Sequence, residues 1–155
     1  MEAETKYWGK KEVAEENILN FTREILAFPD LLRYVLLEEK DTPFLWLQSL
    51  EEKDICFILM NPYLVMPDYQ PEIEKDVLEA LQAKSIEELT FYTMVVVPEE
   101  VKQMRTNLQA PILVNWSKRL ACQTVLTKND YPVRHYIFDA LSGGERNACT
   151  DPQDK

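Results

Sequence analysis

The feature of this sequence that most limits its fold is a series of short apolar runs, rich in β-branched and aromatic residues and separated by Pro, Asn and Asp. Such runs predict strands, and their spacing of about ten residues is typical of an antiparallel sandwich or barrel. The strands are expected at Thr5–Lys10, Asn17–Phe21, Arg33–Leu37, Phe44–Leu50, Ile55–Met60, Thr90–Val97, Ile112–Asn115 and Ala121–Leu126. The predicted fold class is therefore all-β, a small antiparallel β-barrel-like or sandwich domain.

One segment, Pro71–Leu89, has the spacing of a helix instead. Its apolar side chains recur every three or four residues among Glu, Lys and Ala. This pattern predicts one short helical insertion, broken near Ser85, where Ser85 and Glu88 have the spacing of a capping box. Such an insertion would cover an open end or edge of the sheet and hide its unpaired backbone groups.

The chain of 155 residues is long enough for one domain with its own core. We expect the β domain to span residues 1–138. Residues 139–155 hold two of the three glycines and few bulky apolar side chains, which predicts a disordered tail. Because only Gly9 precedes that tail, the turns of the domain must depend on Pro, Asn and Asp.

Charge is unevenly distributed along the chain, whose formal net charge is −10. Residues 1–101 hold 22 Asp and Glu against nine Lys and Arg, whereas residues 102–134 hold one acid against six cations. An acidic surface repels phosphate, so we expect no direct contact with nucleic acid. The basic stretch is expected either to balance neighbouring carboxylates or to dock an acidic partner.

Cysteine use and hydropathy both indicate a cytoplasmic protein without a membrane segment. The longest apolar runs, such as Ile55–Met60, are far shorter than the roughly 20 residues that span a bilayer, and the first residues are polar. Three scattered cysteines form neither a CxxC pair nor a disulfide framework. We therefore expect the cysteines to be structural.

The residue types that catalysis requires are scarce. The sequence holds a single histidine, His135, and no GxSxG, HExxH, P-loop or GxGxxG motif. The paired glutamates, such as Glu15 with Glu16, are adjacent on the chain and would point to opposite faces of a strand. We therefore expect no enzyme, no metal and no cofactor. Three Trp and seven Tyr favour a protein that binds other proteins.

Six motifs, in this order and spacing, resemble the FliW family of flagellar assembly factors over about residues 4–138. They are ETKYWG at the start, PFLWLQS from Pro43, NPY…PDY from Asn61 to Tyr69, VVVPEE from Val95, TNLQAPILVN from Thr106 and DYPVRH from Asp130. The chain departs from the family at FTREILAFPD, residues 21–30, where Pro and Gly are common in the family at Thr22, Glu24, Leu26 and Ala27. A short helical turn is expected there, next to a surface that a partner contacts.

The resemblance implies a compact β-barrel that works by switching partners. Members of the family bind flagellin and, once flagellin is exported, bind the translational repressor CsrA and keep it from flagellin messenger RNA. The expected mode is a monomer that acts without a cofactor. An acidic protein docked beside the RNA-binding surface of CsrA would repel incoming phosphates within a Debye length of about 8 Å.

We predict that cationic and amide side chains in the basic stretch line the partner surface, because they stand out in an otherwise acidic domain. These residues are Arg105, Asn107, Gln109, Asn115, Arg134 and His135. Two alternatives remain open. One is a small hydrolase that uses His135 with a carboxylate, and the other is an RNA-binding barrel of the OB type, which needs exposed aromatic residues on a basic face.

Overall fold

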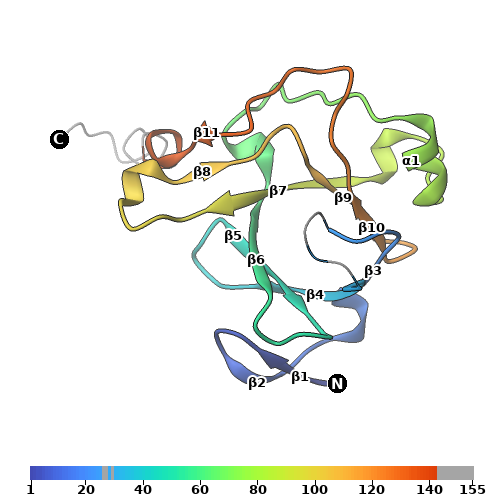
Figure 1. Cartoon of the computed structure of the whole chain (residues 1–155), viewed down its shortest axis with the longest axis vertical. Coiled ribbons are helices and arrows are strands. Elements are labelled where there is room, and N and C mark those ends of the chain that lie inside the picture. Colours follow the sequence, from blue (N-terminus) through green and yellow to red (C-terminus); the bar gives the residue numbers. More distant parts are fainter. Residues whose placement is uncertain (26–27, 29, 143–155) are drawn as a thin grey trace.

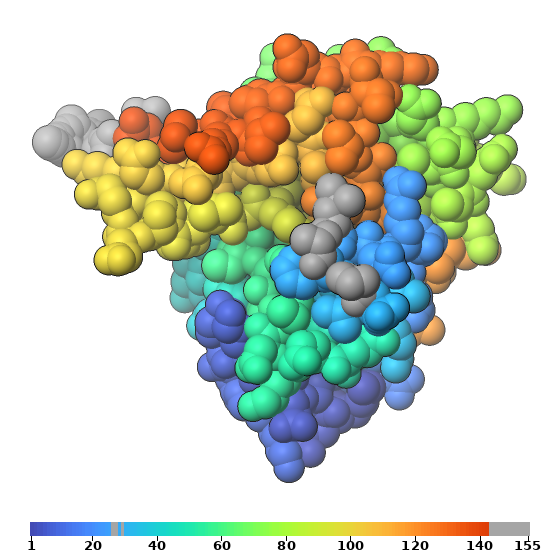
Figure 2. Space-filling model, viewed as in Figure 1, coloured from blue at the N-terminus to red at the C-terminus, as the bar shows by residue number. Residues whose placement is uncertain are grey.

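The computed structural model of the chain describes residues 1–25, 28 and 30–142. Figure 1 shows its arrangement, and Figure 2 shows that three projections surround the central body. One, coloured blue, is the hairpin of β1 (Glu2–Thr5) and β2 (Gly9–Glu12). The second runs from yellow to orange-red and holds β8 (Arg105–Thr106) and β11 (His135–Tyr136). The third, yellow-green, contains α1 (Lys75–Ala80).

The central body is a closed barrel of seven strands, which confirms the all-β prediction and decides for the barrel over the sandwich. The barrel strands are β3 (Ile18–Phe21), β4 (Arg33–Glu38), β5 (Phe44–Ser49), β6 (Cys56–Met60), β7 (Thr90–Val96), β9 (Ile112–Asn115) and β10 (Leu120–Gln123). Pairing of β7 with β9 closes the ring, and all pairings but one are antiparallel. The exception is β3 with β10, which run parallel.

Two apolar layers result from the alternation of side chains along the strands. Inside the barrel, Leu19, Leu36, Leu47 and Leu59 are among the buried residues of the largest core cluster. Tyr34 also lies there, and burial raises its pKa to about 12. Because inward-facing side chains of a small barrel fill its lumen, this layer is a packed core and leaves no channel.

The second layer lies on the outer face of the barrel. Phe91 of β7, Leu113 of β9 and Cys122 of β10 form a row across three strands, and α1 packs Val77 onto the same cluster. The helical insertion therefore covers an outer face of the barrel. Together, the inner and outer layers explain why β7 and β9 carry apolar side chains on both of their faces.

The helical insertion is shorter than the segment that its periodicity indicates. Residues 71–74 are extended and α1 begins at Lys75. It ends where Gln82 takes a left-handed backbone with φ of 55°, and the N–H of Ala83 donates to the carbonyl of Leu78, as in a Schellman motif. After this break the carboxylate of Glu88 accepts from the N–H of Ser85, as the capping box predicted.

The strand predicted at Thr5–Lys10 is wrong, because Thr5 ends β1, residues 6–8 form a turn, and Gly9 and Lys10 begin β2. The Thr5 hydroxyl donates to the carbonyl of Gly9 and accepts from the N–H of Trp8, which closes the turn. Gly9 has φ of 64°, a conformation that glycine adopts without strain. Two further strands, β8 and β11, were not predicted, since each has only two residues.

The other predicted strands correspond to β3 through β7, β9 and β10, with ends that differ by up to three residues. Residues 138–142 form a helical turn, and Leu141 packs against the buried Ile137 cluster. The remainder of the predicted tail, residues 143–155, lies outside the described residues, as do Leu26 and Ala27 of the divergent turn. No helix in the described part of the chain is long and apolar enough to cross a membrane.

Candidate functional site: an exposed arm and an aromatic groove

The first candidate surface is the projection that we call the arm, formed by the end of β7 with β8 and β11. The sheet register places Val96 opposite Arg105, and Arg105 opposite Tyr136. These three side chains therefore form one row across three strands. The neighbouring row, Val95 with Thr106 and His135, faces the other way, and there Val95 and Thr106 are buried.

The row on the solvent side is unusually apolar for an exposed surface. Tyr136 is 53% exposed and Val96 is 48% exposed, and Arg105 lies between them. The exposed apolar residues Val97, Val101 and Val133 lie in the turns that flank the same strands. An exposed apolar patch with charged neighbours is typical of a surface that contacts another protein.

The structure brings Arg105, Arg134 and His135 to the arm, with His135 in the row that neighbours that of Arg105. Arg105 is half-buried on β8, Arg134 is exposed just before β11, and His135 is half-buried on β11. The Arg105 guanidinium donates one long hydrogen bond, 3.4 Å, to the carbonyl of Gln103. Among the described residues neither arginine has an ion pair, so both charges are available to a partner.

The basic stretch nevertheless does not form one continuous patch. Lys118 and Arg119 lie in the hairpin between β9 and β10, across the barrel from the arm (Figure 1). There Arg119 takes a left-handed backbone and its guanidinium donates to the carbonyl of Glu15. The charge count along the chain therefore overestimates the cationic surface, because folding separates these residues.

The three predicted amide residues make hydrogen bonds within the protein. The Asn107 side chain accepts from the N–H groups of Gln109 and Ala110. The Asn115 amide is buried and donates to the carbonyl of Leu81, which holds the end of α1 against β9. Their polar groups stabilise loops, and so the structure offers them little freedom to bind a partner directly.

Gln109 holds together the loop that follows β10. Its amide nitrogen donates to the carbonyls of Leu126, at 2.8 Å, and Asn129, at 3.0 Å. Its amide oxygen accepts from the N–H of Tyr131, at 2.6 Å. One side chain thus fixes three backbone groups of residues 126–131.

Nothing in the described part of the chain gives His135 a catalytic partner. No carboxylate hydrogen bond to His135 is present there, and the described residues contain no group of three or more His, Cys, Asp and Glu that would hold a metal ion. Burial raises the pKa of the Cys56 thiol to about 11, which disfavours the reactive thiolate.

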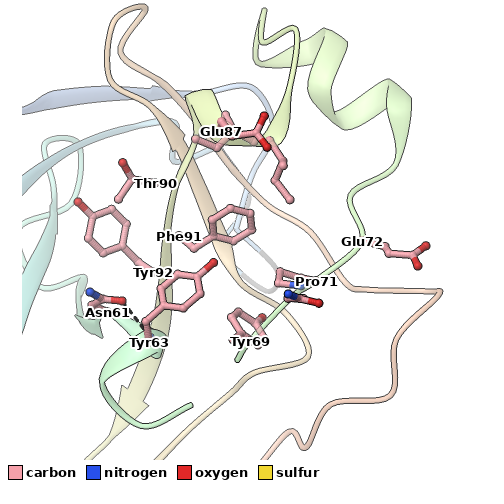
Figure 3. Close-up of a pocket in the computed structure, with 12 residues that line it drawn as sticks. Asn61, Tyr63, Tyr69, Pro71, Glu72, Glu87, Thr90, Phe91 and Tyr92 are labelled. Carbon is pink, nitrogen blue, oxygen red and sulfur yellow. Dashed lines mark hydrogen bonds between the residues drawn. The ribbon is translucent and has the colours of Figure 1, made fainter. Parts of the chain in front are cut away.

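The second candidate surface is a hollow of about 820 Å³ that we call the groove, and sequence reasoning missed it. Tyr63, Tyr69, Phe91 and Tyr92 line it, as Figure 3 shows. They come from two segments, residues 61–72 and 86–92, which are distant in sequence. The motif NPY…PDY contained a signal, since its two tyrosines supply half of these rings.

Burial affects the acidity of the groove tyrosines. Loss of solvent, and secondly the nearby Tyr131, raises the pKa of Tyr63 above its ordinary value. The same causes raise the pKa of Tyr69 further, because Tyr69 is only 2% exposed. The groove therefore presents neutral phenol rings over the physiological range of pH.

Comparison with known proteins identifies similar chains along nearly the whole length. The family model described as FliW protein matches residues 2–137. The flagellar assembly factor FliW of Caldicellulosiruptor bescii is 41% identical over 142 residues, which cover 92% of this chain and 93% of the relative. That of Alkaliphilus metalliredigens is 37% identical over 140 residues, covering 89% and 86%.

A solved structure agrees with these matches. A crystal structure of the flagellar assembly factor FliW superposes with a TM-score of 0.82 at 33% sequence identity. The similarity covers 89% of this chain and 97% of that one. The overall fold of this chain is therefore shared with that protein over most of both chains.

Proposed function

This chain belongs to the FliW family, and from that premise we propose that it is a regulatory binding protein that exchanges flagellin for the repressor CsrA. In this proposal it works as a monomer in the cytoplasm and makes or breaks no covalent bond. When flagellin is exported, the free protein binds CsrA and relieves repression of flagellin messenger RNA. The family membership supports the role in flagellum assembly, and the arm supplies the surface for a partner.

The observation that carries the proposal is the exposed row of Val96, Arg105 and Tyr136. Aromatic and arginine side chains are the residue types that most often dominate the energy of a protein interface. Here they stand beside an exposed valine, and the arginine lacks an ion pair among the described residues. A partner that buries this row would gain apolar contact and a charge-assisted hydrogen bond.

The acidic remainder of the protein provides a reason why binding would antagonise an RNA-binding repressor. In this proposal the arm docks on CsrA, and the many carboxylates of residues 1–101 then stand near its RNA site. Its field would repel phosphates within a Debye length of about 8 Å at physiological salt. Since exposed charges are individually weak, reshaping of the repressor would add to this effect.

The binding surface is tested with the double variant R105A/Y136A, measured by calorimetry against flagellin and against CsrA. We expect affinity for at least one partner to fall about 10-fold or more, since the variant removes both anchors of the row. The matched control is Lys118→Ala, which removes an exposed cation across the barrel. Unchanged affinity for both partners, with the circular dichroism spectrum intact, would refute the arm as the binding surface.

The antagonism is tested by a gel shift of CsrA on the leader of flagellin messenger RNA. Added protein should release the RNA, and flagellin added afterwards should restore the complex. The protein alone should not shift the RNA, and a shift would favour the OB-type alternative. If CsrA kept its RNA at a saturating concentration of this protein, the partner switch would be wrong while the family assignment would stand.

A further inference from the structure

The groove is a second surface that the proposed function leaves unused, and its aromatic rings surround Tyr63. The ring of Tyr63 meets those of Tyr69 and Phe91 edge-on, with centroids 5.9 Å and 6.5 Å away. Tyr63 is 38% exposed, whereas Tyr69 and Phe91 are buried. In Figure 3 the Tyr63 ring lies between the other two, so it is the ring that an incoming group meets first.

The groove is fixed in shape by hydrogen bonds to its lining. The Asn61 side chain accepts from the N–H of Tyr63 at 2.9 Å, which holds the first turn of the 3₁₀ helix Pro62–Leu64. The Tyr69 hydroxyl donates to the carbonyl of Leu108 at 2.6 Å. The Tyr131 hydroxyl accepts from the N–H of Gln70 at 3.0 Å. A surface so held loses little conformational freedom when it binds.

The rim of the groove is acidic. Glu72 and Glu87 belong to its lining, and no lysine or arginine does. In Figure 3 the Glu87 side chain lies nearer Phe91, whereas the Glu72 side chain lies farther out and points away from the rings in the conformation shown. Within the described part of the chain, neither carboxylate makes a hydrogen bond or ion pair. Their neighbour Glu88 differs, because its carboxylate accepts from the N–H groups of Lys84 and Ser85.

An aromatic surface beside unpaired carboxylates attracts one kind of side chain most strongly. The aliphatic stem of lysine or arginine packs on ring faces, and its charged end is attracted to the ring and to carboxylates. An acidic segment would be repelled by the same rim. An uncharged apolar segment would fill the hollow but leave both carboxylates without a partner.

We propose that the groove binds a segment of a partner protein that presents a lysine or arginine next to an apolar side chain. The apolar side chain packs on Tyr63, and the cation reaches Glu72 or Glu87. This site is separate from the row on the arm and uses different residues. It would let the protein hold one partner segment while the arm contacts another surface.

Three short peptides serve as probes against the full chain labelled with ¹⁵N. They are acetyl-Lys-Leu-Phe-Lys-amide, its acidic counterpart acetyl-Glu-Leu-Phe-Glu-amide and the polar acetyl-Lys-Ser-Ser-Lys-amide. We expect the first to shift the amide resonances of the groove residues, with a dissociation constant at least 10-fold lower than either of the others. The shifts should weaken as salt is raised, because the rim carboxylates are exposed.

Two variants test whether binding depends on the groove. Tyr63→Ser and E72K/E87K should each weaken binding of the first peptide about 10-fold. Their matched controls, Tyr7→Ser and E15K/E16K, replace an exposed tyrosine and two exposed glutamates elsewhere and should not change it. All six positions are exposed, so the four variants should fold, which the ¹⁵N spectrum verifies.

Several results would overturn the proposal. One is equal binding of the acidic and basic peptides. Another is undiminished binding by both groove variants. A third is self-association of the free protein in sedimentation that Tyr63→Ser abolishes, which would assign the groove to a second copy of this chain. None of these outcomes bears on the arm, so failure here is distinct from failure of the proposed function.

Discussion

The groove and the arm are built on two halves of one strand, β7, yet the structure holds them differently. Residues Thr90–Tyr92 pair with β9 and close the barrel, whereas at the other end Val95 and Val96 pair with β8, and Val95 still pairs with β6 of the barrel. The groove half is supported by hydrogen bonds from residues far away in sequence, of which the bond from Tyr69 to Leu108 is buried. The arm half is extended by strands of only two residues.

This difference teaches that the basic stretch, residues 102–134, serves both regions in unlike ways. Gln109 fixes the loop that carries Asn129 and Tyr131, and these two in turn accept from the N–H groups of Glu72 and Gln70 in the groove lining. The amides therefore support the groove from behind. Arg105 and Arg134 of the same stretch are left half-buried and exposed, respectively, on the arm.

The largest expected effect is a loss of stability when Gln109, which supports the groove, is replaced. Gln109→Ala removes three hydrogen bonds and leaves their backbone partners unsatisfied. We expect the free energy of unfolding to fall by about 3 kcal/mol. Urea unfolding measures it, and the ¹⁵N spectrum should show the groove resonances shifted and those of β8 unchanged. A loss below about 1 kcal/mol would contradict the assignment of Gln109 as the support of the groove.

A smaller effect is expected from Tyr69→Phe. The variant loses the hydrogen bond to the buried carbonyl of Leu108 and should be destabilised by about 1 to 2 kcal/mol. Removal of an exposed tyrosine hydroxyl on the arm, in Tyr136→Phe, provides the control and should cost almost nothing.

Tyr69→Phe also tests how the stability of the protein depends on pH. Burial raises the pKa of Tyr69 above its ordinary value near 10, so its contribution to stability is complete below pH 10 and is lost as pH rises toward the folded value. The native protein should therefore lose stability above about pH 10. Tyr69→Phe should lose less over the same range, and unfolding midpoints measured at pH 9, 10 and 11 compare the two. Identical slopes would show that Tyr69 does not ionise on unfolding.

Hydrogen exchange should distinguish the arm from the barrel without any substitution. We expect the hydrogen-bonded amides of β11 to exchange at least about 10-fold faster than those of β9, because β11 pairs with β8 over only two residues. Exchange monitored by ¹⁵N spectra at neutral pH measures the ratio. Equal protection would mean that the arm and the barrel open together as one cooperative unit.

The smallest expected effect belongs to the arm. Arg105→Ala should change the free energy of unfolding by less than about 0.5 kcal/mol, since its one hydrogen bond is long. Urea unfolding beside Gln109→Ala makes the comparison direct. A large loss for Arg105→Ala would indicate that the arginine stabilises the arm, and its effect on partner binding would then need Arg105→Lys as a further variant.

Several elements of this fold were predictable from local pattern alone. Short apolar runs rich in β-branched and aromatic residues identified the seven barrel strands, from Ile18–Phe21 to Leu120–Gln123, because such runs bounded by Pro, Asn and Asp are a local property of the sequence. The capping box at Ser85 was predictable because both of its residues lie within one turn of the chain.

The candidate surfaces were only partly predictable. Arg105, Arg134 and His135 were identified by charge and do lie together on the arm. Asn107, Gln109 and Asn115 were selected by residue type, but a sequence does not reveal whether an amide points to a partner or to its own backbone. The partners of these amides, such as Leu81 and Asn129, are up to 34 residues away along the chain.

The sequence by itself determined which segments extend, which one turns helical and how acidic the protein is, because these depend on neighbours within a few residues. Only the tertiary structure decided that β7 closes the barrel against β9, that Lys118 and Arg119 lie away from the arm, and that Tyr63 and Phe91 share a groove. These features require contacts between distant segments. Such contacts form where burial of apolar surface and hydrogen bonding of the whole chain are satisfied together, which no local pattern records.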